Sequence, residues 1–146
     1  MYLLDTNHCS AIIQGEPNVI RRVAQAGLNI ATCVIVQGEL TYMVEKSTQK
    51  ETNRIRMAEF LEDIRIYLVT DSTPNTYGQL KAALFNHFAP KEKSKRRKTK
   101  ITDLGFDEND LWIAAIALQH SLTVVSVDSD FQRIQQVKTL SVETWF

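Results

Sequence analysis

The sequence passes from an apolar run to a polar corner within residues 2–7, Tyr2-Leu3-Leu4-Asp5-Thr6-Asn7. Consecutive apolar residues are typical of a short buried strand, whereas Asp, Thr and Asn favour a turn or a helix cap. The same change recurs near the other end, where the β-branched run Leu122 to Ser126 precedes Asp128-Ser129-Asp130-Phe131. Each stretch therefore predicts a strand that ends at a polar corner, and the second corner is expected to open a short helix.

Between and after these two stretches, helical and strand-like patterns alternate. Helices are expected over residues 17–27, 34–46, 49–65, 74–88 and 111–118, and further strands over 28–32, 66–70 and 139–142. Such alternation favours an α/β three-layer domain with a mainly parallel sheet of four to five strands flanked by helices. A chain of 146 residues has the usual size of one domain, so a single domain over residues 1–146 is expected, with residues 89–106 as one long loop within it.

Composition excludes several classes of protein. Apolar residues make up 44% of the chain and charged residues 23%, which is ordinary for a globular domain and unlike a disordered or fibrous protein. No apolar run reaches the roughly 18 residues of a membrane span, and residues 1–7 lack the basic start of a secretory signal. A cytoplasmic location is therefore expected. Cys9 and Cys33 lack a C-x-x-C spacing and are expected to be free, small apolar side chains.

Basic residues are concentrated in one segment. The chain has 17 basic and 17 acidic residues, but Lys91 to Lys100 holds seven basic residues and one acid, a net charge of +6. The other 136 residues therefore carry a net charge of −6. Affinity for a nucleic acid would have to come from this local patch rather than from the charge of the whole chain.

Four acidic residues are expected to gather at one edge of the sheet. The carboxyl ends of parallel strands and the loops after them line a crevice. Asp5 ends the first strand and Asp128 follows the fourth, while Asp110 lies in the first turn of an alanine-rich helix that starts over the same edge. Glu39 lies at the border of the apolar stripe of helix 34–46, which directs its side chain toward the sheet.

Other roles for three of these acids stay open. Asp5 could form an Asx turn, Asp110 could join Asp107 in capping a helix, and Asp128 could be a helix cap. Glu39 is harder to explain in this way, because a carboxylate at the edge of a buried stripe costs several kcal/mol unless it is paired or bound to a cation.

Four carboxylates close together repel one another unless a cation lies among them. Oxygen-only ligation suits Mg²⁺ or Mn²⁺, which also accept phosphate oxygens of a substrate. The three histidines, His8, His87 and His120, have no paired spacing, so zinc fits poorly.

Four motifs in order carry a resemblance to a known family. They are Leu3-Leu4-Asp5-Thr6-Asn7, Gly38-Glu39-Leu40, the run Asn109 to Ala115 (NDLWIAA) and the run Val124 to Phe131 (VVSVDSDF). Together they resemble the PIN-domain nucleases, in particular the VapC-type toxins of bacterial toxin–antitoxin pairs. The resemblance covers essentially the whole chain.

The resemblance implies a site and an activity. It places metal-binding acids at Asp5, Glu39, Asp110 and Asp128, and supporting polar roles at Thr6, Asn7, Asn109, Ser126 and Asp130. The implied activity is Mg²⁺- or Mn²⁺-dependent hydrolysis of RNA phosphodiester bonds, by in-line attack that leaves 5′-phosphate and 3′-hydroxyl ends. The implied partners are a small antitoxin protein and a second copy of the chain in a homodimer.

Two other functions remain as alternatives. A metal-dependent phosphohydrolase could use Asp5 as a nucleophile, but that chemistry usually wants a second Asp two residues later, and position 7 is Asn. A non-catalytic RNA- or protein-binding module of the same fold would be expected to lack at least one of the acids, and all four are present.

The basic segment adds a candidate RNA contact. An acidic crevice repels RNA, and the segment directly precedes the helix that carries Asp110, so Lys95, Arg96, Arg97 and Lys98 are expected to bind the RNA backbone. The alternatives are a solvated loop and a contact for the protein partner.

Overall fold

A five-stranded, entirely parallel sheet forms the centre of the molecule in a computed structural model that describes residues 1–146. The strands lie in the order β3-β2-β1-β4-β5. They are β1 (Tyr2–Leu4), β2 (Ile30–Cys33), β3 (Arg65–Tyr67), β4 (Thr123–Val125) and β5 (Ser141–Glu143). The first strand lies between β2 and β4, so the chain order reverses at β1, and all strands have their carboxyl ends at one edge. Such a reversal is where open α/β sheets place their ligand crevice.

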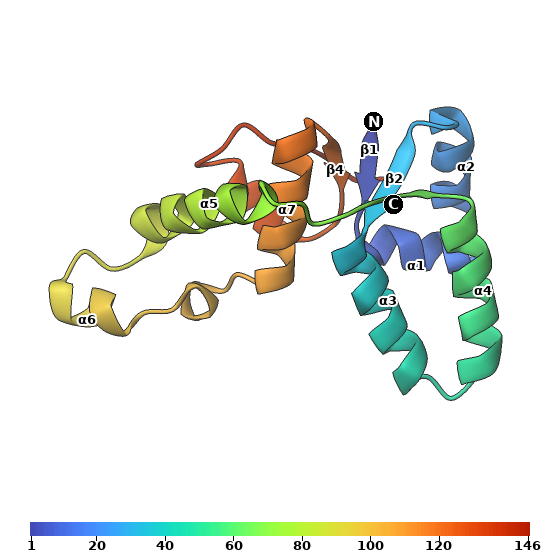
Figure 1. Cartoon of the computed structure of the whole chain (residues 1–146), viewed down its shortest axis with the longest axis horizontal. Helices are drawn as coiled ribbons and strands as arrows, with labels where there is room; N and C mark the ends of the chain where they lie inside the picture. Colours follow the sequence, from blue (N-terminus) through green and yellow to red (C-terminus); the bar gives the residue numbers. More distant parts are fainter.

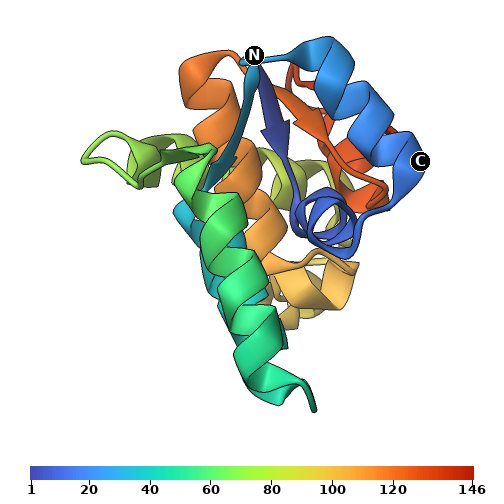
Figure 2. The ribbon, with the colours of Figure 1, turned by 90° about the vertical axis from the view of Figure 1, so that its right-hand side faces the viewer.

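Helices cover both faces of this sheet. They are α1 (Thr6–Gln14), α2 (Pro17–Ala26), α3 (Val34–Lys46), α4 (Lys50–Glu62), α5 (Thr73–Phe88), α6 (Lys93–Lys98), α7 (Glu108–His120) and α8 (Ser129–Ile134), with a 3₁₀ helix, η1, at Ile101–Leu104. Figure 1 shows α5 and α7 on one side of the strands and α1, α2 and α4 on the other. Figure 2 shows α1 and α2 in front of the sheet and α7 behind it. The predicted three-layer α/β fold is confirmed.

The core is built from the strands and α7. Leu3 and Leu4 of β1 and Val124 and Val125 of β4 have no exposed surface. Helix α7 is buried on several sides, as its alanines predict, since small side chains let a helix approach a sheet closely. Both cysteines are buried and free, as expected. None of the helices has the length and apolarity that crossing a membrane requires.

Helix α1 was not predicted beyond its polar corner. Asp5 caps it, with Oδ1 accepting a hydrogen bond from the backbone N–H of Thr6 at 2.7 Å, and Gly15 ends it with a φ of 83°. Residues 6–10 are all poor helix formers, so the sequence gives a weak signal. Cys9 and Ala11 are buried against the core, and this tertiary packing stabilises the helix.

The expectation of one long loop at residues 89–106 is wrong. The segment contains α6 and η1 and projects with the end of α5 as an arm (Figure 1). Arg96 attaches α6 to α5, because its guanidinium donates to Asn86 Oδ1 at 2.8 Å and lies 4.8 Å from the ring centre of Phe85. Six residues cannot sustain a helix alone, so α6 depends on these contacts, which a local sequence pattern does not reveal.

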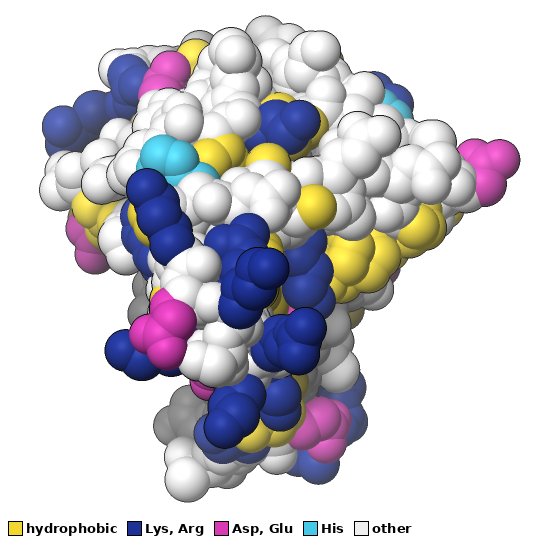
Figure 3. Space-filling model, turned by 90° about the vertical axis from the view of Figure 1, so that its left-hand side faces the viewer, with side chains coloured by type: hydrophobic (Ala, Val, Ile, Leu, Met, Phe, Trp, Pro, Cys, Tyr) yellow, Lys and Arg dark blue, Asp and Glu magenta, His cyan; other side chains and the backbone are white.

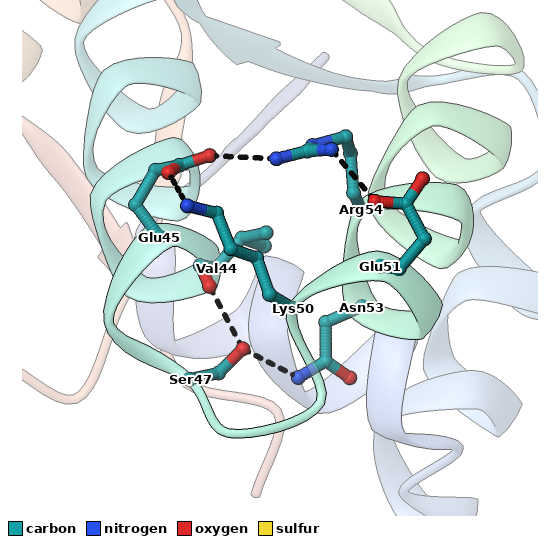
Figure 4. A network of polar contacts seen from close by, with 7 residues as sticks. All are labelled: Val44, Glu45, Ser47, Lys50, Glu51, Asn53 and Arg54. Carbon is teal, nitrogen blue, oxygen red and sulfur yellow. Dashed lines mark hydrogen bonds and ion pairs between the residues drawn. The ribbon is translucent and has the colours of Figure 1, made fainter.

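Helices α3 and α4 form a second arm with a polar network at its turn (Figure 4). Glu45 pairs with both Lys50 and Arg54, and the Asn53 amide donates to Ser47 Oγ at 3.0 Å. Exposed ion pairs of this kind each stabilise only weakly, and here they link the two helices close to the turn between them. The arm thereby holds α3, which carries one of the four acids.

Candidate active site

A cleft of about 1140 Å³ opens at the carboxyl edge of the strands. It lies between α1 and α3 and reaches the start of α7. All four predicted acids, Asp5, Glu39, Asp110 and Asp128, line it. The predicted convergence of the acids is therefore present, and no Lys, Arg or His side chain lies in the lining to neutralise them.

Asp5 has both the capping role and a place in the site. Its side chain is buried, and Oδ2 accepts hydrogen bonds from Ser126 Oγ at 2.6 Å and from Asn7 Nδ2 at 3.2 Å, while Oδ1 accepts from the Thr6 N–H. Burial raises the pKa of Asp5, and the negative charges of Glu39 and other acids add to the rise, whereas the bonds from Ser126 and Thr6 lower it. The carboxyl group therefore has a fixed orientation toward the cleft.

Glu39 is held by neutral donors from two other helices. Thr6 Oγ1, in α1, donates to Glu39 Oε2, and Asn109 Nδ2, in α7, donates to Oε1 at 2.9 Å. The half-buried carboxylate has polar partners but no basic one. Its charge is thus oriented without being neutralised, which leaves it available to a cation or a water molecule.

Asp110 lies closest to other acids. Carboxyl oxygens of Asp110, Asp128 and Asp130 all lie within 4.8 Å of one another. Burial raises the pKa of Asp110 to about 8, and the charges of Asp5, Asp128 and other neighbouring acids contribute further. A group in this state is stabilised as an anion only when positive charge is supplied nearby.

Asp130, expected only as a supporting residue, is a buried member of this cluster. Its Oδ2 accepts from the backbone N–H of Asp107 at 2.8 Å, and Arg133 Nη1 lies 3.5 Å from Oδ1. Burial raises the pKa of Asp130, and the charge of Asp128 adds to this, while the bond from Asp107 opposes it. Asp130 therefore connects α8 to the start of α7 and positions Asp110. The sequence signal was the Asp-x-Asp spacing of Asp128 and Asp130.

The donor set fits a hard divalent cation. Every charged group that reaches the cleft is a carboxylate, and oxygen-only ligation suits Mg²⁺ or Mn²⁺. His8 is close to Asp5 in the sequence, but its side chain is buried. Its Nε2 accepts a hydrogen bond from the backbone N–H of Trp145 at 3.1 Å. That nitrogen is therefore not free to ligate a metal ion.

Two aromatic side chains at the cleft were missed by the sequence analysis. Phe146 and Tyr42 both line it, and they are 58% and 63% exposed. Neither lies in one of the four motifs, so only the fold brings them to the acids.

The basic segment lies outside the cleft. None of the four candidate RNA-binding residues lines it. Basic side chains are gathered on the face that carries the α5–α6 arm (Figure 3). Lys95 pairs with Glu92 at 3.3 Å and Arg96 attaches α6 to α5, whereas Arg97 and Lys98 are exposed and take part in none of the ion pairs.

Comparison with known proteins adds independent information. Ribonuclease VapC2 of Rickettsia felis is 29% identical over 149 residues, an alignment that covers 99% of this chain and 98% of that protein. The crystal structure of VapBC2 from Rickettsia felis, bound to a DNA fragment from the promoter, superposes with a TM-score of 0.77 at 27% identity, over 99% of this chain and 98% of that one.

A DNA-bound VapBC from Salmonella typhimurium has the same fold, with a TM-score of 0.77 at 22% identity over 99% of this chain and 98% of that one. The PIN domain model matches residues 2–137, which include all four acids of the cleft. The sequence motifs, the order of the strands and this match agree, and the chain belongs to the PIN domain family.

Proposed function

We propose that this protein is an Mg²⁺- or Mn²⁺-dependent endoribonuclease and the toxin of a type II toxin–antitoxin pair. The observation that carries the proposal is the convergence of Asp5, Asp110 and Asp128 in one cleft whose lining contains no basic residue. The likeness to a ribonuclease over almost the full length of both chains supports RNA as the substrate.

Asp5, Asp110 and Asp128 would hold the cation, with Glu39 as a further ligand or as the group that orients the attacking water. When bound, a divalent cation neutralises charge that builds on the phosphate and lowers the pKa of the water. Because Thr6 and Asn109 each donate to a different oxygen of Glu39, its carboxylate is oriented before the substrate arrives.

The supporting polar residues keep the acids in place. Ser126 Oγ and the Asn7 amide both donate to Asp5 Oδ2, and the backbone N–H of Asp128 donates to Ser126 Oγ at 3.0 Å. Ser126 thus links two of the proposed ligands through one hydroxyl. Its loss would loosen both acids at once.

RNA would be attracted mainly from outside the cleft. The lining is acidic, so the basic face of the α5–α6 arm is the surface with the charge to bind phosphates. Within the predicted set Lys95, Arg96, Arg97 and Lys98, we assign this role to Arg97 and Lys98, because the other two side chains have protein partners.

Two protein partners belong to the proposal. The solved relatives from Rickettsia felis and Salmonella typhimurium are VapBC complexes, which supports an antitoxin as the partner of this chain.

A homodimer is also proposed, since Tyr42, Met43 and Ile55 expose apolar surface on the α3–α4 arm.

A cleavage assay tests the activity. A fluorogenic single-stranded RNA is incubated with the purified protein and Mg²⁺, and then with EDTA in place of Mg²⁺. Cleavage with Mg²⁺ that EDTA abolishes is expected, with 5′-phosphate ends on the products. Absence of cleavage by the antitoxin-free protein on any single-stranded RNA would overturn the proposal.

A further inference from the structure

An aromatic side chain, Phe146, lies beside the acids in the same cleft. Phe146 lines the same cleft as Asp5 and is 58% exposed. One side of its ring contacts the His8 imidazole, with ring centres 4.6 Å apart at an angle of 52°. Single exposed apolar side chains are common on protein surfaces, so it is the position of this ring beside the acids, and not its exposure, that points to contact with a ligand.

Buried contacts fix the backbone next to this ring. Trp145 is 4% exposed and packs edge-on against Tyr2, with ring centres 5.1 Å apart. Its backbone N–H donates to His8 Nε2, so His8 carries its hydrogen on Nδ1 and donates to Asn7 Oδ1 at 2.6 Å. Phe146 therefore follows a residue that is fixed in the core.

The same chain of hydrogen bonds reaches the proposed catalytic acid. With Oδ1 of Asn7 accepting from His8, its amide nitrogen donates to Asp5 Oδ2 at 3.2 Å. One continuous series of hydrogen bonds therefore runs from the backbone N–H of Trp145 through the side chains of His8 and Asn7 to the carboxylate of Asp5. The series thus links the backbone of the residue before Phe146 to Asp5.

The chemistry of the lining indicates which part of a polynucleotide the ring could bind. Apart from the acids, the cleft offers apolar side chains and neutral polar groups, and it contains no basic residue to contact a phosphate. A nucleobase, in contrast, is neutral and has an aromatic face, and stacking on a side chain such as Phe is a usual mode of binding for single strands.

Tyr42, the other aromatic residue of the cleft, is less suited to this role. The exposed Lys46 ammonium lies 4.8 Å from its ring centre, so one face of the ring is already in contact with a charged group. Phe146 has a buried support on one side and solvent on the other.

We propose that Phe146 is a base-stacking residue, which binds one unpaired nucleobase of the RNA and so sets the position of the scissile phosphate over the acids. The proposal rests on the proposed ribonuclease function. It implies that recognition within the cleft tolerates different bases, because every base has a π face, and that it requires a base at one fixed position relative to the cut.

The first test compares Phe146→Trp, Phe146→Leu and Phe146→Ala in the Mg²⁺-loaded protein. Loss of one stacked base is expected to raise KM for a single-stranded RNA about tenfold in Phe146→Ala, with kcat changed less than about twofold. Phe146→Trp should keep the wild-type KM, and Phe146→Leu should lie between, since it keeps apolar area but has no π face. The matched control is Leu28→Ala, because Leu28 is 97% exposed at the amino edge of the sheet, and its KM should not change.

The second test moves an abasic nucleotide along the RNA, one position at a time. At one position the missing base should raise KM about tenfold for the wild type and leave Phe146→Ala unchanged, because the partner of the base is already absent. Equal penalties in both proteins at every position would overturn the proposal.

A third measurement separates this proposal from the ribonuclease function. RNA that carries the fluorescent base 2-aminopurine, at the position found above or at each position in turn, is titrated with an Asp110→Asn protein. Because this protein is expected not to cleave, the readout is the quenching of 2-aminopurine fluorescence by stacking. Quenching that disappears when Phe146→Ala is added supports the stacking role even if no cleavage is found. Quenching that is the same with and without Phe146 overturns it even in an active nuclease.

Discussion

Ser126 Oγ donates a hydrogen bond of 2.6 Å to Asp5 Oδ2, although the two residues lie 121 positions apart in the sequence. The contact exists because β1 and β4 are neighbours in the sheet and Leu4 is paired with Val125, so the residues that follow both strands meet. The same register places Asp128 beside Asp5. The reversal of strand order at β1 is therefore the structural origin of the site.

Asp110→Asn is expected to abolish cleavage while the metal-free protein becomes more stable. The amide keeps the shape but removes a charge that burial and neighbouring acids make unfavourable, as the raised pKa of about 8 indicates. Activity should fall at least about a hundredfold, and the melting temperature in EDTA should rise by roughly 2–5 °C. The control is Asp71→Asn, at an exposed acid outside the cleft. This substitution should change neither the cleavage activity nor the melting temperature. Full activity of Asp110→Asn would remove this residue from the site.

Mg²⁺ is expected to stabilise the wild type against thermal unfolding. A ligand that binds only the folded state adds about 2.7 kcal/mol at a concentration one hundred times its Kd. Differential scanning fluorimetry over a Mg²⁺ series should show a rising melting temperature, which EDTA reverses. The Asp110→Asn protein should show a much smaller rise. Identical Mg²⁺ responses in the two proteins would mean that the cation binds elsewhere.

The double variant Arg97→Ser and Lys98→Ser is expected to weaken RNA binding at low salt. Each phosphate contact on a single strand contributes about −0.7 to the slope of log K against log salt, so the loss of two contacts should flatten the slope by about 1.4. Fluorescence anisotropy over a range of NaCl concentrations measures this.

Arg96→Ser is the informative comparison within the same segment. Since Arg96 holds α6 against α5, its loss should make residues 91–100 more sensitive to proteolysis. The slope of log K against log salt for RNA binding should change less than in the double variant. An unchanged salt slope in the double variant would contradict the RNA-binding role of residues 91–100. The segment would then be a solvated surface or a contact for the antitoxin.

His8 is expected to make stability depend on pH in the acid range. Burial lowers the pKa of His8 to about 4, below the usual 6.5, so the unfolded chain takes up a proton before the folded one does. The free energy of unfolding should therefore fall as the pH decreases from about 6.5 to about 4, by on the order of 2–3 kcal/mol, and be fully retained above that window. Urea unfolding in EDTA at several pH values measures it. The His8→Gln protein should lack this part of the pH dependence, and parallel curves for the two proteins would refute the role.

The sequence alone was sufficient for the fold class and for the four acids. Short apolar runs followed by Asp or Asn are local signals of strand ends, and in a parallel sheet all such ends lie at one edge, so Asp5 and Asp128 could be placed together without coordinates. Glu39 and Asp110 followed from helical periodicity and from the start of a helix, which are also properties of a few consecutive residues.

Tertiary structure decided the features that depend on contacts between distant segments. Helix α1 forms from weak helix formers because its buried face packs on the core, and α6 exists because Arg96 reaches α5. Asp130 joins the acids through the N–H of Asp107, and Phe146 reaches the cleft through His8, which lies 138 positions earlier in the chain. Local propensity has no information about such partners, because their free energy comes from groups that become neighbours only when the sheet has assembled.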